Sequence, residues 1–148
     1  MSNASTAREL RCVIVTPEKA LLDEPADFVA LPLYDGEIGI LPGRAPLVGR
    51  LGYGELRIRH GGQTRRFFVD GGFVQVRANV VSVLTPKALK AEEISADAAT
   101  RALEAAQVPG KTPEQQDAQL KAQERARAQL RIARKQGEEA RPLETAPL

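Results

Sequence analysis

Several kinds of residue are scarce in this chain of 148 residues. It contains one histidine, His60, one cysteine, Cys12, and no tryptophan. A zinc site of the Cys/His type needs three or four such ligands, so the composition excludes that kind of metal site. One cysteine also excludes an internal disulfide and favours a reducing compartment. Because no nucleophile, general base and orienting group come together in the sequence, we expect neither a catalytic residue nor a cofactor.

Long apolar runs and a strong net charge are also absent. No apolar run approaches the ~20 residues that cross a bilayer, so we expect no transmembrane segment. Residues 1–8 lack the apolar core of a signal peptide and are expected to form a disordered N-terminus. Lysine and arginine number 21 against 19 aspartates and glutamates. The resulting net charge of +2 is too small to make nucleic acid or anionic lipid the default partner.

The residue types that are present divide the chain into two parts. The two tyrosines and four phenylalanines all precede residue 74, whereas alanine, glutamine, glutamate and arginine dominate from Ala91 onward. Intrinsic preference therefore changes from strand to helix at about position 88. We predict a β domain over residues 9–88, a helical domain over residues 89–137 and a loose tail over residues 138–148.

The first part is predicted to consist of short strands separated by glycine and proline. Gly61-Gly62 predicts a tight hairpin, Asp70-Gly71-Gly72 a second turn and Ala78-Asn79 a third. Many short strands at this spacing indicate an antiparallel β-sandwich or barrel. With the helices that follow, the fold class is α+β, mainly β in the N-terminal part. The predicted strands are Leu10–Thr16, Ala26–Leu33, Glu55–Arg59, Thr64–Val69, Phe73–Val76 and Val80–Leu84.

The second part is predicted to form an antiparallel hairpin of two helices. Ser95 is a plausible N-cap of the first helix, which Val108-Pro109-Gly110 ends. Thr112 and Gln115 can form a capping box around Pro113 at the start of the second helix. Gly137 is expected to stop that helix.

The apolar faces of the two helices are thin, because most of their positions are alanine. Each alanine buries little area at ~25 cal/mol/Å². The sequence therefore predicts a weakly held hairpin that is able to open. The face of the first helix comprises Ala98, Ala99, Ala102, Leu103 and Ala106, and that of the second comprises Ala118, Ala122, Ala126, Leu130 and Ala133.

Positive charge is concentrated in the second helix. Between Leu120 and Gln136 the only acidic residue is Glu124, and the local net charge is +5. Such a helix favours an acidic partner. The alternative is that these side chains are simply solvated on an exposed helix. The basic residues are Lys121, Arg125, Arg127, Arg131, Arg134 and Lys135.

The densest motif is Asp35-Gly-Glu-Ile-Gly-Ile-Leu-Pro-Gly-Arg-Ala-Pro-Leu47. Its glycines permit unusual backbone angles and its two prolines fix others. It lacks the Lys-Ser/Thr ending of a phosphate-binding loop, and no helix is predicted to follow it. From the residues alone, we interpret it as a rigid structural turn between strands.

This motif closely resembles the signature of the epsilon subunit of rotary F-type ATP synthases, Gly-Glu-Ile/Leu-Gly-Ile-x-Pro-Gly-His-Ala-Pro-Leu. The segment Asp70-Gly-Gly-Phe-Val-Gln-Val76 is similar to a second family segment, and Ala128-Gln-Leu-Arg-Ile132 to a third. The resemblance covers about Leu10 to Gln136. It implies a flattened β-sandwich followed by a two-helix C-terminal domain.

The resemblance also implies a function. Subunits of this family are non-catalytic parts of the central stalk that bind the gamma subunit, sit on the ring of c subunits and help to couple proton flow to ATP synthesis. We therefore expect a peripheral protein on the cytoplasmic face of the bacterial inner membrane. The expected contacts with the c-ring loops and gamma are Glu37, Ile38, Leu41, Pro42, Arg44 and Pro46.

The helical hairpin of this family can extend toward the alpha and beta subunits and restrain ATP hydrolysis. The resemblance assigns that inhibitory role here to the six basic residues of the second helix. Some members also bind ATP through Ile-Asp-x-x-Arg-Ala, but Ser95 and Ala98 replace the Asp and the Arg of that pattern. Asp97 and Arg101 would substitute only after a shift of the pattern.

A further departure is Arg44, which stands where the family has histidine. Arginine stays charged at every relevant pH, so any pH sensitivity of that contact would be lost. Glu37 either shapes its loop or contacts the c-ring. We interpret Cys12 as a small buried hydrophobe and His60 as an exposed turn residue.

Two other functional classes remain as alternatives. One is a stand-alone β-barrel module whose basic helix contacts RNA, although that helix has no aromatic residue on which bases could stack. The other is a small enzyme, against which the single histidine argues.

Overall fold

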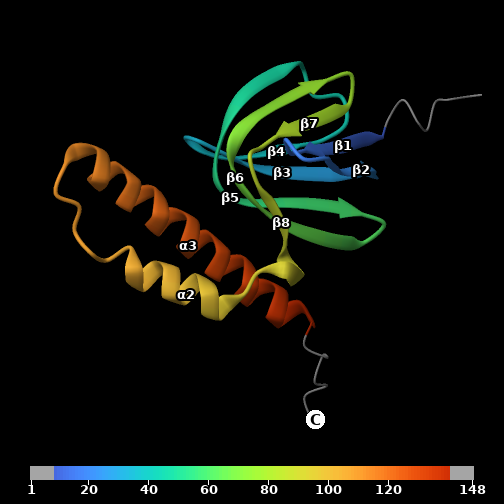
Figure 1. Cartoon of the computed structure of the whole chain (residues 1–148). Coiled ribbons are helices and arrows are strands. Elements are labelled where there is room, and N and C mark those ends of the chain that lie inside the picture. Colours follow the sequence, from blue (N-terminus) through green and yellow to red (C-terminus); the bar gives the residue numbers. More distant parts are fainter. Residues whose placement is uncertain (1–8, 141–148) are drawn as a thin grey trace, which may run out of the picture. The chain divides into compact units, whose positions relative to one another are not determined.

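The computed structural model describes residues 9–140, with side chains up to Glu138. The predicted disordered N-terminus and residues 141–148 of the predicted tail lie outside the described residues. The chain divides between Lys90 and Ala91 into two compact units, which we call the β domain and the helical domain (Figure 1).

The β domain is one mostly antiparallel sheet, in agreement with the predicted fold class. The order of strands is β2-β1-β7-β6-β5-β3-β4, and β8 pairs with another part of β6. The pairing of β1 with β7 is parallel. The strands are β1 (Leu10–Val15), β2 (Ala20–Ala26), β3 (Phe28–Leu33), β4 (Gly36–Ile40), β5 (Leu47–His60), β6 (Gln63–Arg77), β7 (Val80–Leu84) and β8 (Ala88–Lys90).

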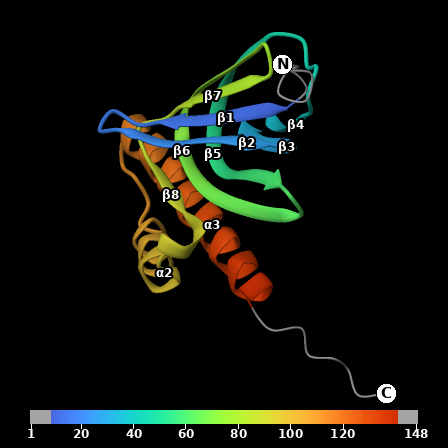
Figure 2. The same ribbon diagram turned by 90° about the vertical axis from the view of Figure 1, so that its right-hand side faces the viewer.

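The sheet closes over one apolar core because its two longest strands curve strongly. Figure 2 shows β5 and β6 sweeping around the other strands of the domain. As a result β2 contacts β5, although the two lie far apart in the order of strands. Side chains alternate between core and solvent as the pleat requires. The largest buried side chains of this core include Leu10, Ile14, Leu31, Ile40, Leu51, Leu56, Ile58 and Phe67.

Cys12 belongs to this core, as predicted, and is fully buried. Burial, with a smaller contribution from the charge of Glu24, raises the pKa of its thiol to about 12. The thiol is therefore neutral at physiological pH and packs as a small apolar group.

The prediction of a turn at Asp70-Gly71-Gly72 was wrong, because β6 runs through these residues without interruption. On one side of the bend, Phe67–Val69 pairs with β8, and on the other side Phe73–Arg77 pairs with β7. The two glycines have φ of +75° and +106°, which side chains disfavour. They bend the strand, so that the residues before the bend pair with β8 and those after it pair with β7.

Three further strands, β2, β4 and the three-residue β8, were not predicted from the sequence. β2 carries Asp23, Glu24 and Pro25 and lies at the edge of the sheet, where charge and proline are tolerated. β4 lies inside the motif that we interpreted as a turn, and its pairing with β3 makes it regular. The predicted hairpin at Gly61-Gly62 and the turn at Ala78-Asn79 are confirmed.

The helical domain begins with a short 3-10 helix, η1 (Ala91–Glu93), followed by α2 (Ala96–Ala105) and α3 (Pro113–Ala140). Ser95 caps α2, because its Oγ accepts a hydrogen bond from the Ala98 N–H at 3.1 Å. α3 packs against both α2 and η1. Figure 1 shows α2 and α3 as an antiparallel pair.

The prediction that the second helix ends at Gly137 was wrong. α3 continues through this residue to Ala140, so residues 138–140 are helical and do not belong to a loose tail. A glycine inside a helix costs only about 1 kcal/mol, and Gly137 does not adopt the positive φ of a C-cap.

We predict that Gly72→Ala strongly destabilises the β domain. An added Cβ would lie 2.0 Å from the carbonyl oxygen of Leu84, and the φ of +106° would add strain. A loss of at least about 3 kcal/mol in the free energy of unfolding is expected in chemical denaturation. Gly61→Ala is the matched control, since its Cβ would meet no atom within 4 Å. It should lose only about 1 kcal/mol. Equal losses for the two variants would contradict this account of the bend.

Candidate functional site

The predicted contact residues gather around the exposed segment that joins β4 to β5. Ile40 is buried at the end of β4, and Leu47 is half-buried at the start of β5. All six residues between them, Leu41–Pro46, are exposed, and we call them the docking segment. It contains four of the predicted contacts, namely Leu41, Pro42, Arg44 and Pro46. The other two lie on β4, where Glu37 is exposed and Ile38 is half-buried and packs against the core.

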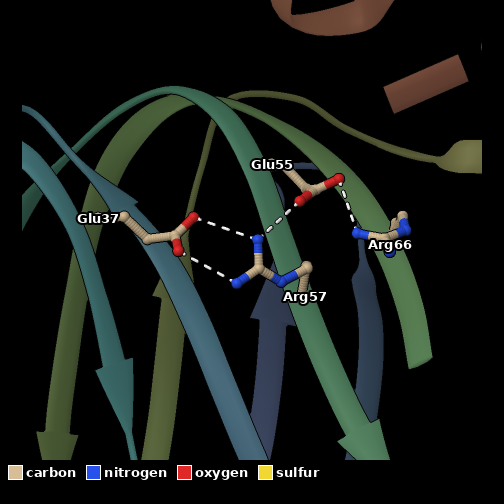
Figure 3. A network of polar contacts seen from close by, with 4 residues as sticks. All are labelled: Glu37, Glu55, Arg57 and Arg66. Atoms are coloured by element: carbon tan, nitrogen blue, oxygen red, sulfur yellow. Dashed lines mark hydrogen bonds and ion pairs between the residues drawn. The ribbon is translucent and has the colours of Figure 1, made fainter. Parts of the chain in front are cut away.

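Glu37 takes part in an ion-pair network across three strands (Figure 3). Arg57 of β5 donates to both of its carboxylate oxygens, at 3.1 and 3.3 Å. Arg57 also donates to Glu55 at 3.0 Å, and Arg66 of β6 donates to the other oxygen of Glu55 at 3.1 Å. The bidentate contact fixes the orientation of the Glu37 carboxylate.

The network also stabilises the charged form of Arg57. Burial lowers the pKa of its guanidinium, but the hydrogen bonds and charges of Glu55 and Glu37 outweigh burial and raise that pKa above its ordinary value. A carboxylate that is half exposed and already paired can still accept a hydrogen bond from a partner protein. Glu37 therefore ties β4 to β5 through Arg57 and is also accessible to a partner.

Arg44 differs from the arginines of this network. It is exposed, and within the described residues it forms no ion pair. Its guanidinium thus presents an uncompensated positive charge within the docking segment, which also carries the exposed side chain of Leu41. A segment of this kind offers a mixed apolar and cationic surface to a partner.

A second exposed surface was not recognised in the sequence. Phe73 is 59% exposed and Leu84 is 53% exposed, and the two face each other across β6 and β7. Phe73 also lies opposite Arg50 of β5, whose guanidinium stacks 4.3 Å from the centre of the Tyr34 ring. Val48, two residues before Arg50, shares this outer face and is exposed. We call these five residues the Phe73 patch.

The patch left a signal that the sequence analysis overlooked. In the Phe73-Val-Gln-Val76 segment, Val74 and Val76 are buried, so the alternation places Phe73 outward. A large aromatic side chain on the solvent face of a strand is typical of an interaction surface when other apolar residues surround it.

The structure separates the six predicted basic residues of α3 into two groups. Lys121, Arg125 and Lys135 are half-buried and already engaged, and Lys121 pairs with Asp117 at 3.1 Å. Arg127, Arg131 and Arg134 are exposed and form no ion pair among the described residues. Their spacing of four and three residues puts them on one face of the helix. We call these three residues the arginine stripe.

The hairpin is held by more than its alanine face. Ala99, Ala106 and Ala126 are buried, but Ala118 is exposed, and Ile132 is buried although the predicted face omitted it. Apolar contact between α2 and α3 is therefore modest, as the sequence indicated.

Two glutamines of α3 add polar contacts at the end of the hairpin. The side-chain amides of Gln119 and Gln123 both donate to the carbonyl oxygen of Ala106, the C-cap of α2, at 3.0 and 2.9 Å. Gln119 also accepts from the N–H of Gly110 at 3.1 Å. These contacts, which we call the glutamine clasp, satisfy backbone groups that the end of a helix leaves without partners.

The residues considered for an ATP site lie on α2 and at its N-terminal cap. Asp97 and Arg101 are exposed on α2, and Ser95 is occupied as the N-cap.

Among the described residues, no group of three or more His, Cys, Asp or Glu side chains is arranged to hold a metal ion. His60 is exposed at the end of β5, as predicted, with its Nδ1 3.4 Å from Asp27. Within residues 9–140, no helix is long and apolar enough to cross a membrane.

A curled β domain with two exposed apolar and charged surfaces, followed by a helical hairpin, defines a class of protein. A family model for the delta/epsilon chain of ATP synthase, β-sandwich domain, matches residues 9–91. The chain is thus built on a delta/epsilon-type β-sandwich.

Whole-chain similarity narrows this class. The ATP synthase epsilon chain of Rhodopirellula baltica is 52% identical over 126 residues, covering 84% of this chain and 98% of that one. The epsilon chain of Carboxydothermus hydrogenoformans is 44% identical over 100 residues, covering 68% and 75%. The chain therefore belongs to the family of ATP synthase epsilon chains.

Solved structures agree with this assignment. A chain in the mitochondrial ATP synthase of Euglena gracilis, solved as an OSCP/F1/c-ring complex, is similar with a TM-score of 0.76 and 25% identity. The match covers 82% of this chain and 79% of that one. A chain in the central stalk and c-ring of the Tetrahymena thermophila mitochondrial ATP synthase has the same fold, with a TM-score of 0.63, 18% identity and coverage of 84% and 96%. The matches give no support to the RNA-binding alternative.

We predict that the glutamine clasp contributes measurably to the hairpin. Gln119→Met and Gln123→Met together remove three side-chain hydrogen bonds and keep chain length. We expect a loss of about 1–3 kcal/mol in the stability of the helical domain and faster amide exchange at Gly110, measured by NMR. Gln129→Met, a substitution outside the clasp, is the control. Unchanged exchange at Gly110 in the double variant would show that the clasp does not hold the loop.

Proposed function

We propose that this chain is a non-catalytic rotor subunit of the central stalk, whose β domain links the gamma subunit to the c-ring. The observation that carries the proposal is the presence of two exposed surfaces, the docking segment and the Phe73 patch, on one β domain. A subunit that joins two partners needs such a pair of surfaces, and the close-packed core of the domain that carries them resists deformation.

The docking segment is the surface proposed for the c-ring. It carries the family signature, it is exposed along its whole length, and it contains the uncompensated charge of Arg44. Glu37, held by Arg57, adds an acidic group beside it on β4. Together they give the segment charges of both signs, which favours specificity over simple attraction.

The Phe73 patch is the surface proposed for the gamma subunit. Its aromatic and aliphatic side chains with one stacked arginine have the composition of an interface centre. Aromatic and arginine residues contribute most of the binding energy in such centres. The patch therefore suits a stable contact, as expected between subunits that turn together.

The arginine stripe is proposed to restrain ATP hydrolysis by contacting the alpha and beta subunits. Three exposed cations on one helix face form a line of charge that an acidic surface can pair with. The engaged group of Lys121, Arg125 and Lys135 is assigned a structural role within this chain. This proposal narrows the six predicted inhibitory residues to three.

The site of action follows from these partners. A subunit seated on the c-ring lies at the membrane surface without crossing it, and we assign it to the cytoplasmic face of the bacterial inner membrane. The family membership and the bacterial origin of the similar epsilon chains support this location.

We predict that Phe73→Asp weakens binding to the gamma subunit by at least about tenfold, because it places a charge at the centre of an apolar interface. Phe73→Leu, which keeps an apolar side chain, should lose much less. Affinity is measured by isothermal titration of purified gamma with the full chain, after circular dichroism has shown that both variants are folded. Equal affinities of Phe73→Asp and the unmodified chain would assign the gamma contact to another surface.

We predict that the combined Arg127→Glu, Arg131→Glu and Arg134→Glu variant raises ATP hydrolysis by the assembled enzyme about tenfold, since three lost ion pairs at roughly 0.5 kcal/mol each amount to about 1.5 kcal/mol. The matched control replaces the same three residues by lysine, which keeps the charge and should keep hydrolysis low. If hydrolysis by the glutamate variant equals that of the unmodified enzyme, the stripe is only a solvated face.

A further inference from the structure

The turn between β6 and β7 is held both by the pairing of these two strands and by a hydrogen bond to β1. Arg77 pairs with Val80 to close the hairpin, and the carbonyl oxygen of Asn79 accepts a hydrogen bond from the N–H of Arg11 at 2.8 Å. Ala78 and Asn79 have φ of +50° and +64°. Asparagine is among the few residues with a side chain that adopt this left-handed conformation readily.

The side chain of Asn79 reaches a distant part of the chain. Its Oδ1 accepts a hydrogen bond from the N–H of Gly43 at 2.7 Å, across 36 residues of sequence. Gly43 has φ of +87° and follows Pro42, an arrangement typical of the two central residues of a type II turn. This hydrogen bond thus joins the turn of the docking segment to the β6–β7 hairpin, which is itself hydrogen-bonded to Arg11 of β1.

We propose that Asn79 is the positioning residue of the docking segment, which it holds in the orientation that contacts the c-ring. The proposal rests on the proposed function, and it adds a residue outside the family signature. Asn79 touches no partner itself in this account. It acts through Gly43, whose neighbour Arg44 carries the charge that meets the partner.

The exposure of the segment explains why one hydrogen bond matters. The residues from Leu41 to Pro46 do not pack into the core, so their orientation depends on turn geometry and on this tie to Asn79. A loose segment would lose conformational entropy when it binds, and a segment ordered beforehand avoids that cost.

Two substitutions separate the role of the side chain from that of the turn. Asn79→Gly keeps the left-handed backbone but removes the acceptor, whereas Asn79→Asp keeps both. In the full chain, we expect amide exchange at Gly43 to become about five- to tenfold faster in Asn79→Gly, the factor that one hydrogen bond provides. Asn79→Asp should exchange like the unmodified chain. Equal exchange at Gly43 in the two variants would overturn the proposal.

The second measurement is the affinity of the complex with gamma for detergent-solubilised c-ring. Asn79→Gly should lower this affinity about fivefold, whereas Asn79→Asp should have the affinity of the unmodified chain. Neither substitution should change binding to gamma. Faster exchange at Gly43 with undiminished affinity for the c-ring would overturn the positioning role alone. Arg44→Glu tests the proposed function separately. If that reversal leaves the affinity unchanged, the docking segment is not the c-ring contact and both proposals fall.

Discussion

The close approach of two backbones at Gly72 is the constraint on which the rest of the β domain depends. Only a residue without a side chain allows β6 to pass so near the carbonyl oxygen of Leu84. The bend lets β6 pair with β8 on one side and with β7 on the other, so one sheet curls over a single core. It also fixes β7 beside β1, and thereby the position of the hairpin whose Asn79 holds the docking segment.

Charge is distributed differently in the two domains. In the β domain the arginines Arg57, Arg65 and Arg66 each pair with a glutamate, so their charges stabilise the sheet and are not free for a partner. In α3 the arginine stripe has no such partner among the described residues. Paired charges within the sheet suit a rigid domain that stays docked, with Arg44 of the docking segment left for a partner, whereas the exposed arginine stripe suits a contact that forms and breaks.

The sequence predictions were accurate where structure depends on residues close together in the chain, and less accurate where it depends on residues far apart. Ser95 as a cap, the hairpin at Gly61-Gly62 and the start of α3 depend on neighbours within a few residues, and the structure confirms them. The turn at Gly71-Gly72 and the end of α3 at Gly137 were wrong, because the same glycine serves a turn, a bend or a helix interior according to what lies beside it. The glutamine clasp was missed because it joins residues of two different helices, whereas the outward position of Phe73 follows from a local alternation that was overlooked.

The sequence by itself determined the α+β class, the change from strand to helix, the exposed signature of the docking segment and the excess of positive charge in the second helix. These properties depend on residue type and local spacing, which the chain carries in any conformation. Only the tertiary structure decided which charges remain uncompensated, which apolar side chains face solvent and which side chain reaches Gly43. Those outcomes depend on contacts between residues far apart in the sequence, and such contacts exist only once the sheet has closed.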